Sequence, residues 1–92
     1  CIVERVLFLQ PRHVSIEADD TFWVPLVHGA PREDGLWEAW IEFQPLDDRP
    51  MRVTARETTQ PNREAVSYWA SGLEPVYFEG AFARAGDVRQ PD

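Results

Sequence analysis

The feature that most constrains this chain is the segment from Trp37 to Gln44, in which side chains alternate with a period of two. Ile41 and Phe43 point to one side of an extended chain and Glu42 to the other, because successive side chains of a strand face opposite ways. A polar turn of sequence P-L-D-D-R-P follows, and the chain returns through residues 51–59. This pattern predicts a β-hairpin with one apolar face and one charged face.

One register of this hairpin satisfies both its apolar and its charged residues. It places Glu42 opposite Arg52 and Glu38 opposite Arg56, with apolar residues paired on the other face. Opposite charges across a strand pair contribute about 0.2–1 kcal/mol each, and a slip of one residue would oppose apolar and charged groups. We therefore predict this register.

Proline and glycine divide the preceding part of the chain into short pieces. We expect a strand buried on both faces over residues 2–10 and a short strand over residues 14–17 that ends at an Asp19-Asp20 turn. An irregular or edge segment over residues 21–24 and a loop over residues 28–35 are expected to follow. The third piece is followed by Pro25, which has no N–H to donate to a neighbouring strand.

After the hairpin, the sequence predicts a helix and one more strand. The helix is expected to begin at Pro61, with Thr59 or Gln60 at its N-cap, and to end before a left-handed Gly72. Alternating side chains over residues 75–84 then predict a final strand. A right-handed crossover would place it parallel to the returning strand of the hairpin.

These elements predict one α+β domain over residues 1–85. Its fold is a mostly antiparallel β-sheet with one short helix packed on one face, in which the hairpin is followed by a helix crossover to the final strand. Residues 86–92 are expected to form a flexible tail. The expected core consists of Trp37, Ile41, Phe43, Val53, Trp69, Val76, Phe78 and Phe82.

Charge and composition exclude several kinds of partner. The net charge is −7, and all nine basic residues are arginine. An acidic surface repels phosphate backbones and anionic lipids, so neither nucleic acid nor a membrane is an expected partner. The absence of lysine is typical of GC-rich bacterial genomes. With no apolar run longer than Val6 to Leu9, we expect a bacterial, cytoplasmic protein.

The sequence lacks the motifs of the common enzyme classes, including phosphate-binding loops, nucleophile elbows and metal-binding H-E-x-x-H or C-x-x-C patterns. Glu38 and Glu42 share a strand face, but about 13 Å of strand separates them, beyond the spacing of glycosidase carboxylates. The two histidines, His13 and His28, have no metal-ligand spacing. We assign no catalytic residue, metal or cofactor, and the balance favours a protein that is not an enzyme.

Trp40 is the unusual residue of the hairpin, because its large ring stands on the charged face between Glu38 and Glu42. Three explanations are open. The N-terminal segment covers the ring, a second subunit covers it, or the ring forms the floor of a site for a cationic ligand. In the second case these three residues form an interface between two copies.

The junction between the hairpin and the helix is the densest polar run of the chain. Its side chains could cap the helix and close the turn, or they could bind an anion or small molecule beside the exposed backbone N–H groups. The candidate ligand-binding residues are Thr58, Thr59, Gln60, Asn62, Arg63 and Tyr68.

The segments W-E-A-W-I-E-F, R-E-T-T-Q-P-N-R, Y-W-A-S-G-L-E-P-V-Y and E-G-A-F-A-R-A resemble a family of short bacterial proteins without an assigned activity. The resemblance implies a self-contained bacterial domain and transfers no catalytic residue. We expect a non-enzymatic binding or assembly module, with a homodimer formed through the aromatic sheet face as one form of it. The alternative is a small-ligand binder or minor enzyme that uses the Thr58–Arg63 junction.

Overall fold

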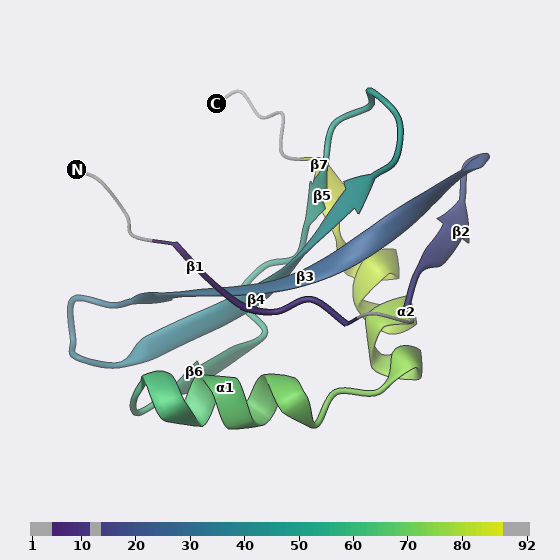
Figure 1. Ribbon diagram of the computed structural model, residues 1–92. Helices are drawn as coiled ribbons and strands as arrows, with labels where there is room; N and C mark the ends of the chain where they lie inside the picture. Colours follow the sequence, from purple (N-terminus) through teal and green to yellow (C-terminus); the bar gives the residue numbers. More distant parts are fainter. Residues whose placement is uncertain (1–4, 12–13, 88–92) are drawn as a thin grey trace.

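The computed structural model describes residues 5–11 and 14–87 (Figure 1). Over these residues the chain forms a seven-stranded sheet and two helices. The elements in chain order are β1 (Val6–Leu9), β2 (Ile16–Ala18), β3 (Thr21–Pro31), β4 (Trp37–Pro45), β5 (Arg52–Val53), β6 (Thr58–Gln60), α1 (Arg63–Ser71), α2 (Pro75–Arg84) and β7 (Gly86–Asp87).

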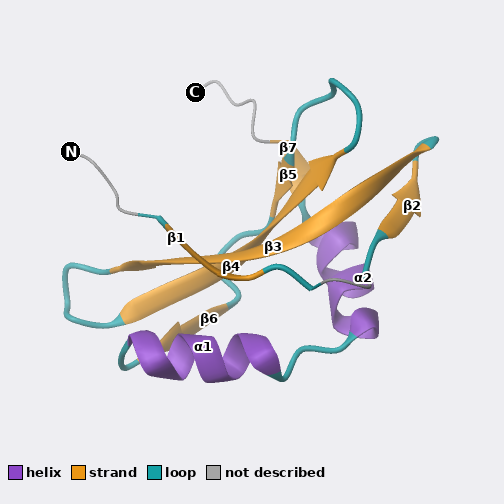
Figure 2. Cartoon of the chain, viewed as in Figure 1, coloured by secondary structure: helices purple, strands orange, loops and turns teal. Residues whose placement is uncertain are grey.

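The strands of the sheet follow the order β1-β3-β4-β5-β7, with β2 also paired to β3 and β6 also paired to β4. Every described pairing is antiparallel. The prediction of an α+β fold with a mostly antiparallel sheet is therefore confirmed. The prediction of a single helix is wrong, because α1 and α2 both pack against the sheet (Figure 2).

The prediction of an edge or irregular segment before Pro25 is wrong, because this segment lies inside β3, the long central strand. The backbone explains how proline is accommodated there. Phe22 accepts a hydrogen bond from Leu46 on the β4 side, so Pro25, three residues on, points to the other side. On that side β2 pairs up to Trp23 and β1 pairs from Val27, which leaves Pro25 at the gap between them. The missing N–H therefore breaks no ladder.

Other N-terminal predictions have mixed outcomes. The short strand is confirmed as β2, and Asp19 and Asp20 form the turn after it with φ of 54° and 68°. The expected loop over residues 28–35 is wrong in its first half, because β3 continues to Pro31. The first strand is not buried on both faces: β1 is an edge strand, and Leu7 is 49% exposed. Residues 2–4 of that prediction lie outside the described residues.

The predicted hairpin register is wrong by one residue. Glu42 lies opposite Val53, and Phe43 lies opposite Arg52. The returning strand is also interrupted after two residues. There the Thr54 hydroxyl, in place of a backbone carbonyl, accepts the N–H of Ile41 at 3.1 Å. Pairing with β4 resumes only at β6.

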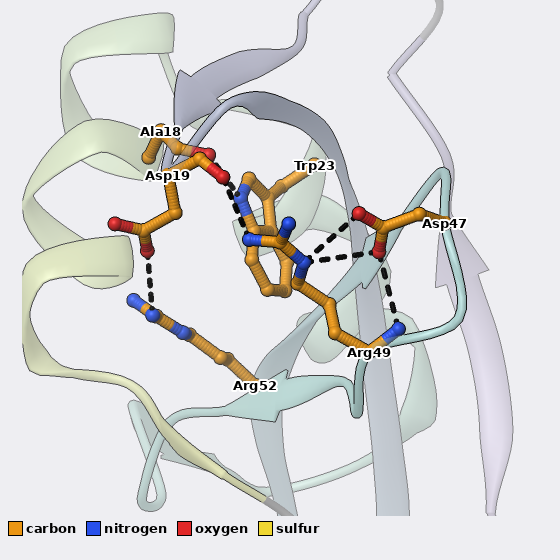
Figure 3. Close-up of polar contacts among 6 residues, drawn as sticks. All are labelled: Ala18, Asp19, Trp23, Asp47, Arg49 and Arg52. Atoms are coloured by element: carbon orange, nitrogen blue, oxygen red, sulfur yellow. Dashed lines mark hydrogen bonds and ion pairs between the residues drawn. The ribbon is translucent and has the colours of Figure 1, made fainter.

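Arg52 shows through its contacts why the predicted register, with its cross-strand charge pairs, is not adopted. Its guanidinium stacks on the rings of Trp23 and Phe82, 4.9 and 4.8 Å from the two centroids, and donates to Asp19 at 2.9 Å. Arg49 donates to the Asp19 carbonyl at 2.7 Å (Figure 3). Stacking on aromatic rings combined with an ion pair stabilises more than one cross-strand ion pair does.

Helix α1 is confirmed, with corrections at both caps. Asn62 is the N-cap, and its side chain accepts the N–H of Ala65 at 2.9 Å; Thr59 and Gln60 lie in β6 instead. Gly72 follows the helix as expected, but its φ of −94° is not left-handed.

The predicted final strand is wrong, because its residues form helix α2. Pro75 occupies the first turn, where its missing N–H costs nothing. Phe78, Ala81 and Phe82 recur at helical spacing and pack against the sheet, while Val76 points outward and is 69% exposed. The predicted parallel pairing and crossover are therefore wrong too.

The core lies between the sheet and the two helices. The expectation is confirmed for Ile41, Phe43 and Phe78, which are fully buried, and is wrong for Val76. The buried cluster consists of Trp23, Val27, Ile41, Phe43, Ala70, Phe78 and Ala81. The molecule measures 40 × 33 × 18 Å, so its short dimension holds one sheet and one layer of helices.

Candidate functional site

The face of the sheet turned away from the helices is the candidate site, and we call it the open face. Trp23, Val27, Ile41 and Phe43 point into the helix-covered core. Side chains alternate along a strand, so the even-numbered residues of β3 and β4 point the other way. The open face therefore includes Phe22, Val24, Leu26 and His28 of β3 and Glu38, Trp40, Glu42 and Gln44 of β4.

One half of the open face is apolar. Phe22 is 46% exposed and Leu46, directly across from it, is 67% exposed. A shallow groove of about 400 Å³ opens beside them, lined by Gln10, Val24, Leu26, Gln44, Pro45 and Leu46. Among the residues that the structure describes, no charged side chain lines this groove. Large apolar side chains in such a patch are typical of a surface that binds another protein.

The other half of the open face carries a polar cluster centred on Glu42, whose side chain is only 3% exposed. One carboxylate oxygen, Oε2, accepts the guanidinium of Arg5 and the indole N–H of Trp40, both at 2.9 Å. A buried carboxylate requires such partners, because losing water is costly for a charge. The charge of Glu42 is therefore neutralised within the face.

His28 completes this cluster from β3, where it lies opposite Trp40. Its Nδ1 is 3.5 Å from Oε1 of Glu42 and is buried without a hydrogen-bond partner. Burial lowers the pKa of His28, which outweighs the opposing effect of the nearby Glu42 carboxylate; Arg5 lowers it further. The ring is therefore neutral near pH 7. The sequence interpretation missed this residue because it placed His28 in a loop.

The predicted interface residues Glu38, Trp40 and Glu42 do share the open face. Trp40 is half-buried. The described strand of the N-terminal segment, β1, does not cover it, because β1 pairs with β3 at the edge of the same sheet. Glu38 faces Arg32 at 3.5 Å rather than Arg56. From the described N-terminal residues, Arg5 reaches the cluster.

The candidate ligand-binding residues of the strand–helix junction make local contacts. Gln60 donates to Thr58 at 2.8 Å, and Asn62 caps α1. Arg63 lies 5.9 and 5.8 Å from the ring centroids of Phe8 and Trp37. The two remaining candidates, Thr59 and Tyr68, are exposed.

A second polar group ties α2 to the segment between β5 and β6. Glu57 accepts the hydroxyl of Tyr77 at 2.5 Å and the guanidinium of Arg84 at 2.6 Å. Burial, followed by the Glu57 carboxylate, raises the pKa of Tyr77 to about 12. These contacts join two parts of the fold.

Within residues 5–11 and 14–87, no three His, Cys, Asp or Glu side chains gather closely enough to hold a metal ion. Neither described helix has the length and apolarity needed to cross a bilayer. Comparison with family models, curated proteins and solved structures gives no match.

Proposed function

We propose that this chain is a binding and assembly module without catalytic activity, and that it associates with a second copy of itself through the open face. The observation that carries the proposal is the apolar half of that face, where the exposed Phe22 and Leu46 lie beside a groove whose described lining residues are uncharged. Covering such side chains with a partner stabilises the complex by about 25 cal/mol for each Å² of apolar surface removed from water.

Electrostatics favour a second copy as the partner. The chain carries a net charge of −7, so two copies repel each other across most of their surfaces. On the open face, Glu42 is neutralised by Arg5, and Glu38 faces Arg32. These paired carboxylates therefore add less repulsion between two acidic chains than unpaired carboxylates would.

The size of the open face is also sufficient. The molecule measures 40 and 33 Å along its two long axes. A standard stable interface buries about 800 Å² on each partner, which is less than that area. Stacking two open faces would also give each sheet a covered layer on both sides, as in a β-sandwich.

The alternative, a small-ligand site at the Thr58–Arg63 junction, has weaker support. The side chain of Asn62 already accepts a hydrogen bond as the helix cap, and that of Gln60 already donates one to Thr58. The groove described above is lined by other residues.

Light scattering at increasing protein concentration tests the proposal. A reductant is required, because the chain contains one cysteine that could link two copies. We expect a dimer mass for the native chain, a monomer for Leu46→Glu, and a dimer for the matched control Val76→Glu on α2. A native chain that stays monomeric at millimolar concentration would contradict the proposal.

A further inference from the structure

The open face carries an aromatic projection and a groove side by side. Phe22 and Val24 are two residues apart on β3, so their side chains point the same way about 7 Å from each other. The ring of Phe22 stands at one end of the groove, and Val24 and Leu26 line it. One strand therefore presents both a protruding ring and a recess.

Given the self-association proposed above, we infer that each copy inserts the ring of Phe22 into the groove of the other copy. The occupant of the groove is thus a second copy of this chain. A two-fold axis parallel to the sheet, perpendicular to β3 and close to Val24, produces this arrangement. Rotation about that axis reverses β3 and carries the ring of one copy over Leu26 of the other.

Such an arrangement is isologous, because the same patch is used twice and the assembly closes as a dimer. Two facing sheets lie about 10 Å apart, a distance that a phenylalanine side chain can bridge. A partner of another kind would use the ring or the groove, whereas a second copy fills both at once.

The chemistry of the groove suits an aromatic ring. Val24, Leu26, Pro45 and Leu46 offer apolar contacts. The described polar side chains that line the groove are uncharged amides, such as Gln44, so the ring meets no charged lining residue among the described ones. Buried aromatic anchors in small pockets are the residues that dominate interface energies.

Two variants separate the ring from the groove. Phe22→Ala removes the ring and leaves the groove, whereas Gln44→Trp fills the groove and leaves the ring. Because each dimer loses two anchors, we expect Phe22→Ala to raise the dissociation constant at least roughly 100-fold. Gln44→Trp should also dissociate the dimer. Tyr68→Ala, on the exposed side of α1, should leave it unchanged.

Mixing the two variants supplies the decisive measurement. In the mixed dimer, Phe22 of the Gln44→Trp chain can enter the free groove of the Phe22→Ala chain. We expect this dimer to be tighter than either variant's own dimer, as measured by sedimentation with one chain labelled. If apolar surface alone drives association, the mixed affinity will fall between the two, which would overturn the inference.

The outcomes also distinguish this inference from the proposed function. A monomeric native chain contradicts both. A native dimer that Leu46→Glu dissociates, but that Phe22→Ala leaves intact, supports the function and overturns the inserted ring. Circular dichroism and melting temperature must show that each variant is folded. If Phe22→Ala is unfolded, Phe22→Ser at the same exposed position and Gln44→Trp provide the same comparison.

Discussion

His28 and Glu42 lie on neighbouring strands with Nδ1 of the imidazole 3.5 Å from Oε1 of the carboxylate, and both side chains are at least nine-tenths buried. A neutral imidazole and a carboxylate are thus held together on a sheet face that the described helices do not cover. This contact gives the fold a pH dependence near neutrality.

We predict that acid destabilises the fold through His28. Burial lowers its pKa in the folded chain, whereas in the unfolded chain it is about 6.5. The unfolded chain therefore binds the proton first, so the stability is full above pH 6.5 and is lost as the pH falls below it. One proton changes the free energy of unfolding by at most about 1.4 kcal/mol per pH unit. Urea unfolding at pH 7.5 and 5.5 should show this loss, and His28→Gln should reduce it. An equal loss in both proteins would contradict the prediction.

A second prediction concerns the acid of the same cluster. Glu42→Ala leaves the Trp40 N–H without its acceptor, but Arg5 is half-exposed and can be hydrated. We therefore expect a loss of about 1–3 kcal/mol, below that for a fully buried ion pair. Glu42→Gln keeps an acceptor and should lose less. The exposed Glu17→Ala is the control, expected to change stability by less than about 0.5 kcal/mol in urea unfolding.

Two residues of α2 make a matched pair for the core. Phe78 is fully buried against the sheet, and Val76 is mostly exposed on the same helix. Phe78→Ala should cost about 3–5 kcal/mol, enough to unfold much of a small domain. Val76→Ala should cost less than about 0.5 kcal/mol. Similar melting temperatures for the two variants would argue against the observed helical packing.

The last prediction tests the role of the strand–helix junction. Asn62→Ala removes the acceptor of the Ala65 N–H and should cost about 1 kcal/mol in thermal unfolding. Asn62→Ser should retain most of that stability, because serine is also a good N-cap. Ser67→Ala, on the exposed side of α1, serves as the control. A neutral Asn62→Ala variant would show that the side chain has a purpose other than capping.

The elements that sequence reasoning found correctly are those with one dominant local signal. The alternation around Ile41 and Phe43 predicts β4, and Pro61 with Gly72 brackets α1. In α2, by contrast, Phe78 and Phe82 are four residues apart, a spacing that suits one face of a strand as well as of a helix. Ala81 is buried next to Phe82, and this pairing of adjacent residues on one side is what a helix produces.

The sequence by itself determined that this is an acidic α+β domain with a mostly antiparallel sheet, because short-range periodicity sets where a chain is extended. Only the tertiary structure decided the register and the open face. A cross-strand ion pair such as Glu42 with Arg52 is too weak to fix a register, and Arg52 instead stacks on the rings of Trp23 and Phe82. The His28–Glu42 contact likewise exists only after β3 pairs with β4, and Pro25 inside β3 conceals that strand from a reading of the local sequence pattern.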